Sequence, residues 1–122
     1  MILLDTHAAI WILQGHRRVR LLAPYPRLYL SPASVLEIQF LAEAGRLRLS
    51  EGQSPTTVAE DSRWRLDEPA AAKWFAAACE LSWTRDPFDR LLAGHARVRG
   101  WKLATADTVL LERLAASDVL PL

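Results

Sequence analysis

Short apolar runs alternate along this chain with stretches in which apolar residues recur every three or four positions. A short apolar run bounded by polar residues is typical of a strand buried on both faces, and the longer spacing is typical of an amphipathic helix. Their alternation favours an α/β fold with a parallel sheet covered by helices on both faces. The expected strands are Met1–Leu4, Leu28–Leu30, Glu80–Ser82, Lys102–Ala104 and Asp118–Leu122.

Capping residues predict where the helices begin and end. Asp86-Pro87 places a good N-cap residue before a proline at the first helical position. Glycines at 15, 45 and 100 follow helical stretches and predict helix ends. The expected helices are His7–Gln14, a helix from Ser31-Pro32 to Gly45, a short helix around Thr56–Ser62, an alanine-rich helix over Pro69–Cys79, a helix from Asp86 to Gly100 and a helix from Asp107 to Leu114.

With 122 residues, 51% of them hydrophobic and 24% charged, the chain has the composition of one ordinary globular domain over residues 1–122. Cys79 is the only cysteine, which excludes an internal disulfide and a thiolate metal cluster and suits a reducing compartment. No apolar run approaches the roughly 20 residues that cross a membrane, and no basic segment precedes the apolar start. We therefore expect a cytoplasmic protein without a membrane segment.

Basic and aromatic residues bear on possible partners. A basic cluster at Arg17, Arg18 and Arg20 is either a solvated helix end or a weak contact for RNA phosphates. Five tryptophans are many for this length. Because tryptophan is enriched at interfaces and the core is not large, we expect some of them to cover an interface.

Four acidic residues stand at strand ends or in the early turns of the helices that follow: Asp5, Glu37, Asp89 and Asp107. Residues just beyond the carboxyl ends of parallel strands line the ligand crevice of an open α/β sheet. Carboxylates gathered there repel one another unless a cation neutralises them, and Mg²⁺ or Mn²⁺ accepts such oxygen ligands. A site of this kind polarises a phosphodiester and lowers the pKa of a bound water, which indicates hydrolysis of a nucleic-acid backbone.

Each of these acids also has a structural explanation. Asp5 and Asp107 can cap helices, Asp89 suits the helix dipole, and Glu37 can face solvent. Asp86 is interpreted first as an N-cap. The three histidines lack metal-ligand spacing, and the chain has no glycine-rich phosphate loop, no G-x-S-x-G and no Cys–His pair. The spacing alone leaves a metal-binding crevice and a set of helix caps both open.

Taken together, these residues resemble the PIN-domain family, and most closely the small VapC-like toxin ribonucleases of bacterial toxin–antitoxin pairs. The R-D-P-F-D-R and S-V-L-E-I runs are the most specific, and residues 51–68 add nothing to the match. The matching segments are M-I-L-L-D-T-H at 1–7, S-P-A-S-V-L-E-I at 31–38, G-R-L-R-L at 45–49, R-D-P-F-D-R-L-L-A at 85–93 and L-A-T-A-D at 103–107.

The resemblance implies a three-layer fold, in which helices flank a five-stranded parallel sheet, and an Mg²⁺- or Mn²⁺-dependent endoribonuclease. Its implied partners are an RNA substrate, a cognate antitoxin and a second copy of the chain. Thr84 stands where relatives often carry His, and His95 where they often carry Gln, so two accessory contacts differ. By motif match the catalytic and metal-binding acids are Asp5, Glu37, Asp89 and Asp107, with Thr6, Asp86 and Thr105 in support.

Two other classes compete with this interpretation. An aspartate-based phosphatase or phosphoryl-transfer domain also places an acid after its first strand, but it usually has a second acid two residues on, where this chain has His7. A non-catalytic binding module would tolerate the loss of one member of the acidic quartet, and all four are present.

Overall fold

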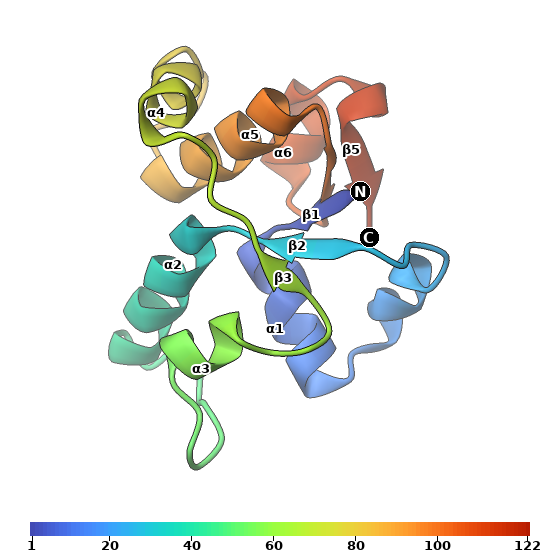
Figure 1. Ribbon diagram of the computed structural model, residues 1–122, viewed down its shortest axis with the longest axis vertical. Coiled ribbons are helices and arrows are strands. Elements are labelled where there is room, and N and C mark those ends of the chain that lie inside the picture. The colour runs from blue at the N-terminus through green and yellow to red at the C-terminus, as the bar shows by residue number, and fades with distance from the viewer.

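One parallel sheet is built from five short strands: β1 (Ile2–Leu4), β2 (Leu28–Leu30), β3 (Arg65–Leu66), β4 (Lys102–Thr105) and β5 (Val119–Pro121). The computed structural model describes all residues from 1 to 122 (Figure 1). The strand order is β3-β2-β1-β4-β5, and every neighbouring pair is parallel. Because the order reverses at β1, the carboxyl ends of β1 and β4 lie at the topological switch point where α/β proteins bind ligands.

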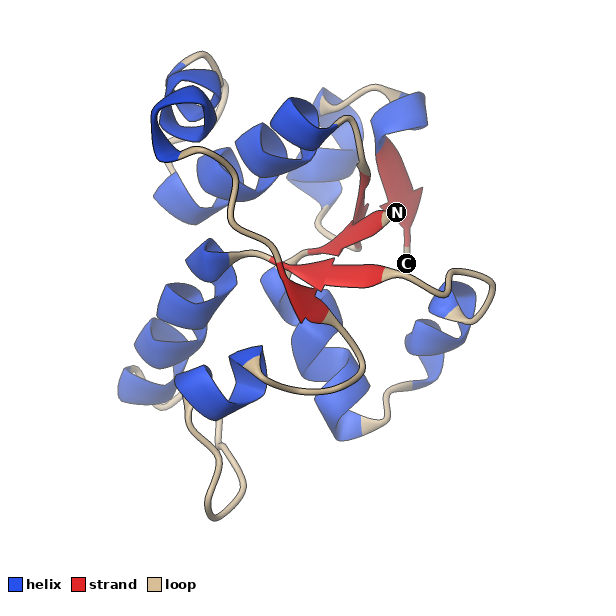
Figure 2. Cartoon of the chain, viewed as in Figure 1, coloured by secondary structure: helices blue, strands red, loops and turns tan.

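Helices cover both faces of the sheet (Figure 2). Two short 3-10 helices, η1 (Arg17–Leu22) and η2 (Ala116–Asp118), precede β2 and β5. The α-helices on one face are α1 (Thr6–Gln14), α2 (Pro32–Glu43) and α3 (Pro55–Ala59), and those on the other are α4 (Ala71–Cys79), α5 (Pro87–Arg99) and α6 (Thr108–Arg113). None of these helices combines the length and the apolar character needed to cross a membrane.

Successive residues of β1 point to opposite faces and fill two separate cores. Ile2 and Leu4 pack into a cluster with side chains of α1, α2 and α3. Leu3 packs on the other face with Leu92 of α5 and Leu110 of α6. All five side chains are at most 2% exposed. The predicted three-layer α/β fold with a five-stranded parallel sheet is therefore confirmed.

Most helix boundaries lie where capping residues predict them. The side chains of Ser31 and Asp86 cap α2 and α5, and each helix continues with a proline in its first turn. Gly15 and Gly100 end α1 and α5 in the left-handed region, with φ of 67° and 68°. A side chain is strained at this φ, which is why glycine ends these helices.

The predicted third strand at Glu80–Ser82 is wrong. The backbone N–H of Leu81 bonds to the carbonyl of Ala78 at 3.2 Å, so this segment closes α4 in a turn instead of pairing with a strand. Leu81 is buried, which explains the apolar signal. The third strand is Arg65–Leu66, a two-residue edge strand with both residues exposed, and it therefore lacks the apolar run that marks a central strand.

The short helix expected around Thr56–Ser62 spans Pro55–Ala59 instead. Its start is fixed by a reciprocal cap. Ser54 Oγ accepts the N–H of Thr57 at 3.2 Å, and Thr57 Oγ1 accepts the N–H of Ser54 at 2.7 Å. This capping box begins the helix one residue early.

Two tryptophans are structural, which contradicts an interface role for them. Trp64 and Trp74 are 4% and 7% exposed. Their indole Nε1–H groups donate to the carbonyls of Val58 and Leu91, at 3.0 and 2.7 Å. A buried tryptophan needs such a partner, and here Trp64 closes the segment after α3 while Trp74 joins α4 to α5. The other three, Trp11, Trp83 and Trp101, are half-buried.

Candidate active site

Two acids lie side by side because β1 and β4 are neighbouring parallel strands. Leu4 pairs with Ala104, and the N–H of Asp5 bonds to the Ala104 carbonyl at 3.0 Å. Asp5 is 5% exposed, and its Oδ1 accepts the N–H of Ala8 at 2.7 Å at the start of α1. Asp107 is exposed, and its Oδ1 accepts two N–H groups at the start of α6. Both carboxylates cap helices and keep further lone pairs for a ligand.

Glu37 and Asp89 come to the same edge of the sheet from α2 and α5. These helices touch through Phe40 and Phe88, whose rings meet edge to face with centroids 5.5 Å apart. Glu37 and Asp89 are both half-buried. Asp89 lies in the first turn of α5, where a negative charge also suits the helix dipole.

The pKa values show that these charges act on one another. Burial, followed by the charges of Asp86, Asp107, Glu37 and Asp5, raises the pKa of Asp89 to about 7. Burial also raises the pKa of Asp5, with a smaller contribution from Asp107. Burial raises the pKa of Glu37, with smaller contributions from Asp86 and Asp5. The structure therefore brings all four predicted acids, and Asp86, together at one negatively charged edge of the sheet, the position expected for the crevice.

Buried hydroxyl groups lie between the acids. Thr6 Oγ1 donates to Ser34 Oγ at 2.9 Å, and the Thr6 side chain also opposes the effect of burial on the pKa of Glu37. Thr105 Oγ1 accepts the N–H of Asp107 at 3.0 Å. A hydrogen bond from Thr105 likewise offsets part of the effect of burial on the pKa of Asp5. Thr6 and Thr105 thus lie where supporting residues were expected.

Two further residues of the crevice were not predicted as site residues. Ser34 is 0% exposed and holds Thr6 through the bond above. Its signal was its place one turn before Glu37 on α2. His7 is exposed, and its charge opposes the effect of burial on the pKa of Asp5 and Glu37. It directly follows the D-T pair after β1, so its position at the crevice was available from the sequence.

Asp86 and Thr84 shape the start of α5. Asp86 Oδ1 accepts the N–H groups of Phe88 and Asp89 at 2.8 and 3.3 Å, which confirms Asp86 as an N-cap. Thr84 Oγ1 accepts the N–H of Asp86 at 3.2 Å, and Arg90 Nε donates to the Thr84 carbonyl at 2.7 Å. Thr84 therefore supports the cap.

His95 belongs to the packing of α5 and not to the crevice. It is 0% exposed, and its Nε2 lies 2.7 Å from Asp67 Oδ2. Arg99 Nε donates to the same oxygen at 2.9 Å. Burial lowers the pKa of His95 despite the opposing effect of Asp67, which favours the neutral form of the ring. Asp67 follows β3, and the three side chains join that edge strand to α5.

The basic cluster Arg17, Arg18 and Arg20 is not brought to the crevice. α1 begins at Thr6, beside the carboxyl end of β1, and runs to Gln14 before η1 begins. η1 therefore lies at the edge of the sheet where the strands start. Arg18 covers the ring of Trp11 at 5.5 Å, and Arg20 Nε donates to the Arg17 carbonyl at 3.2 Å.

The donors fit a hard divalent cation in their chemistry. Carboxylates with nearby hydroxyl groups are the oxygen ligands of Mg²⁺ and Mn²⁺, whereas no cysteine thiolate, the soft ligand of structural zinc sites, lies among these residues. No three acidic, histidine or cysteine side chains converge into a ready-made metal-binding group. The carboxylates would have to move toward an ion from their present hydrogen bonds.

Comparison with solved structures gives matches along the whole chain. VapBC2 from Rickettsia felis bound to a promoter DNA fragment matches with a TM-score of 0.69 and 18% identity, over 100% of this chain and 99% of that one. A toxin–antitoxin complex from Klebsiella pneumoniae matches with a TM-score of 0.68 and 15% identity, over 98% and 96% of the two chains. FitAcB from Neisseria gonorrhoeae matches with a TM-score of 0.57 and 26% identity, over 99% and 96%.

Comparison with the sequences of curated proteins gives no significant match to this chain. The model of the PIN domain family matches residues 2–116, which include every acid of the crevice and all strands except β5. The chain therefore belongs to the PIN domain family, a family of nucleases.

Proposed function

We propose that this chain is an Mg²⁺- or Mn²⁺-dependent endoribonuclease, formed by a single nuclease domain over residues 1–122, and the toxin of a toxin–antitoxin pair. One observation carries the proposal. Acids from four separate segments lie near one another at the carboxyl edge of β1 and β4, where burial, and then their charges, raise the pKa of Asp89 to about 7. Such a concentration of negative charge is costly for the fold and favours a cation.

The residues that would hold the ion are Asp5, Glu37, Asp89 and Asp107. The bound cation polarises a phosphodiester and lowers the pKa of a nearby water. The helix caps hold one oxygen each of Asp5 and Asp107 in place, at 2.7 and 2.9 Å from their nearest N–H donors. Thr6 and Thr105 would position Glu37 and Asp5 through their hydroxyl groups, and Ser34 holds Thr6 in place. Asp86 fixes the turn that carries Asp89.

Cleavage of labelled RNA by protein stripped with a chelator tests this function. We expect no cleavage until Mg²⁺ or Mn²⁺ is added, and none by the Asp5→Asn variant under either condition. Full cleavage in chelator would contradict the assignment. Release of phosphate from a simple phosphomonoester without RNA cleavage would favour the phosphatase alternative. RNA binding without cleavage in the presence of both ions would favour a binding module.

The partner proposal comes from the relatives and from the surface of α2. Of the similar structures, the one from Klebsiella pneumoniae is a toxin–antitoxin complex, and VapBC2 from Rickettsia felis is bound to a fragment of promoter DNA. Leu36 and Phe40 on α2 are 51% and 52% exposed, and Leu36 adjoins Glu37. An antitoxin helix that covered these side chains would also block access to the carboxylates. A homodimer is the second proposed contact, and a monomer in sedimentation at high micromolar concentration would contradict it.

A further inference from the structure

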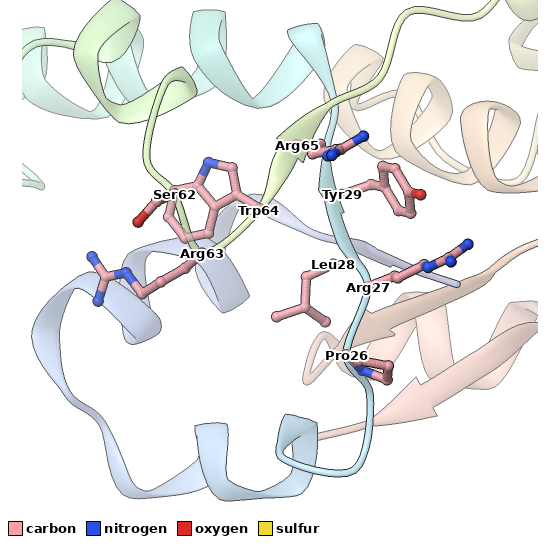
Figure 3. A pocket seen from close by; sticks show the side chains of 8 residues that line it. All are labelled: Pro26, Arg27, Leu28, Tyr29, Ser62, Arg63, Trp64 and Arg65. Carbon is pink, nitrogen blue, oxygen red and sulfur yellow. The ribbon is translucent and has the colours of Figure 1, made fainter.

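Arginine and aromatic side chains share one face of the sheet where β2 and β3 begin. A pocket of about 390 Å³ lies there, between the segments that lead into the two strands. Figure 3 shows Arg27, Tyr29 and Arg65 leaving the backbone on one side, while Arg63 extends to the other. The register explains this arrangement, because Arg65 pairs with Tyr29 and Arg27 precedes Tyr29 by two residues. Residues two apart on a strand point to the same face.

Arg27 and Arg65 are exposed, and no carboxylate lies within ion-pair distance of either one. Arg63, by contrast, binds Asp61 at 2.8 Å and donates to the carbonyl of Ile12 at 3.2 Å. The charge of Arg63 is thus already paired with a carboxylate of the same chain. Those of Arg27 and Arg65 are available to an external anion.

Aromatic rings continue this face between the cations. Tyr29 stacks on Trp101, with ring centroids 4.4 Å apart and planes 27° apart. The Arg99 guanidinium lies 5.8 Å from the centroid of the Trp101 ring, but its charge is paired with Asp67, so the free cations of this face are Arg27 and Arg65. Guanidinium groups that alternate with aromatic rings suit single-stranded nucleic acid, because the cations bind phosphates and the rings stack with bases. An acidic peptide would use only the arginines.

This face begins at the edge of the sheet opposite to the crevice. Asp5 and Asp107 follow the carboxyl ends of their strands, whereas Arg27 precedes β2. Strands of three or four residues span roughly 10–13 Å, so a single ligand needs several nucleotides to reach from one edge to the other. The carboxylates repel RNA phosphates, and attraction must therefore come from elsewhere on the molecule.

We propose that Arg27, Tyr29 and Arg65 form a second, non-catalytic contact for a single strand of RNA, whose remainder reaches the acidic crevice. The choice of RNA rests on the proposed ribonuclease function. The competing structural explanation is that the arginines only protect β3, an edge strand, from pairing with other chains. That explanation predicts no effect of these side chains on RNA affinity.

The test is the affinity for a labelled single-stranded RNA, measured in an Asp5→Asn background that prevents cleavage. We expect Arg27→Gln with Arg65→Gln to raise Kd about tenfold and to reduce the dependence of log Kd on log salt by about 1.4, the value for two lost phosphate contacts. The matched control is Arg46→Gln with Arg48→Gln, which removes two exposed, unpaired arginines elsewhere. The control should keep both values.

Cleavage by the protein with Asp5 intact separates this inference from the proposed function. The Arg27→Gln, Arg65→Gln variant should raise KM for a long RNA with little change in kcat, and should cleave a dinucleotide as the parent does. Equal RNA affinity for the variant and its control would overturn the inference even if the parent cleaves RNA. Loss of affinity in the variant alone would uphold it even if no RNA is cleaved. Equally tight binding of a polyglutamate peptide, lost in the same variant, would assign the face to a protein partner and overturn it.

Discussion

Asp86 and Asp89 share the first turn of α5 but have different environments. Asp86 is exposed and accepts two backbone N–H groups, whereas Asp89 is half-buried and faces four other carboxylates. Because Asn caps a helix about as well as Asp, Asp86→Asn should fold normally and keep most RNA cleavage. Asp89→Asn should also fold normally, bind Mn²⁺ more weakly and lose cleavage by orders of magnitude.

Thermal melting and RNA cleavage of both variants, measured side by side, check this assignment. An inactive Asp86→Asn beside a fully active Asp89→Asn would reverse the roles of the two aspartates. Normal cleavage by both would mean that the acidic crevice is not the active site.

The raised pKa of Asp89 also predicts a pH dependence for the metal-free protein. Burial and the neighbouring carboxylates raise this pKa to about 7 in the folded state, above its ordinary value of 3.8. The folded state therefore holds the proton more tightly than the unfolded state. The stability that this proton contributes is present below about pH 4 and is lost as the pH rises to about 7. In chelator, Asp89→Asn should melt higher than the parent at about pH 8 and equally at about pH 4. The same difference in Tm between the two proteins at every pH would show that the charge of Asp89 does not destabilise the folded state.

At the scale of residues, the sequence predicted the acids better than their surroundings. The four acids stand in short motifs at strand ends and helix starts, so motif and topology together place them. Ser34 and His7 were missed because an isolated serine or histidine has many uses, although Ser34 stands one turn before Glu37 and His7 directly follows Asp5 and Thr6. The weak RNA contact expected for the basic cluster at η1 stays a prediction, and the structure places the cluster away from the crevice, because charge alone does not say at which edge of a sheet a residue lies.

At the scale of elements, α4 and α5 are held together by a close approach at Gly94. A Cβ added there would lie 3.0 Å from the backbone nitrogen of Ala78 and 3.3 Å from its Cα. Backbone atoms cannot move aside as a flexible side chain can. We expect Gly94→Ala to cost about 1–3 kcal/mol of stability by forcing the helices apart, against up to about 1 kcal/mol gained in helix propensity.

Chemical unfolding of the Gly94→Ala variant measures whether the steric cost exceeds the gain in helix propensity. The Ala96→Gly variant, changed in the same helix, is the control. Ala96 is 5% exposed and belongs to the core cluster that contains Leu3 and Leu92. Removing its methyl group therefore reports the effects of helix propensity and of a small cavity, without steric conflict. A more stable Gly94→Ala protein would show that α4 adapts to the added methyl group.

β3 is the element that the sequence could not predict, and a polar cluster holds it in place. Asp67, directly after β3, binds His95 at 2.7 Å and Arg99 at 2.9 Å, while its own N–H bonds to Leu30 at 3.0 Å. The remaining His95 nitrogen, Nδ1, is buried without a partner. Two exposed residues carry no periodic signal, and the bonds that fix them come from a helix more than 25 positions away.

Removing the carboxylate of Asp67 should therefore release this edge of the sheet. Asp67→Ala leaves both nitrogens of a fully buried imidazole unpaired, and we expect a loss of about 2–3 kcal/mol in urea unfolding. Asp61→Ala is the matched control, because the Asp61–Arg63 ion pair is a surface contact worth about 0–1 kcal/mol. Equal losses in the two variants would mean that the His95 cluster contributes no more than an ordinary surface pair.

At the scale of the whole molecule, charge is divided between the two edges of the sheet. The acids of the crevice follow the carboxyl ends of the strands, and Arg17, Arg27 and Lys102 lie where strands begin or just before. The formal net charge of +1 conceals this division. Because helices of a parallel α/β fold begin at the carboxyl edge of the sheet, the N-caps Asp5, Asp86 and Asp107 lie at that edge.

This concentration of acids predicts that a divalent cation stabilises the whole fold. A ligand that binds only the folded state adds about 2.7 kcal/mol at a hundredfold excess over its Kd, which raises Tm by several degrees in a domain of this size. Mn²⁺ should therefore raise the Tm of the parent protein and have little effect on Asp5→Asn, which keeps the cap to Ala8 but removes a central charge. Asp118→Asn is the control, because this exposed acid precedes β5 at the opposite edge and should leave the Mn²⁺ effect intact. Calorimetry with and without Mn²⁺ measures all three proteins without reference to activity. An equal rise in Asp5→Asn, or no rise in the parent, would show that the carboxylates of the crevice do not bind the cation.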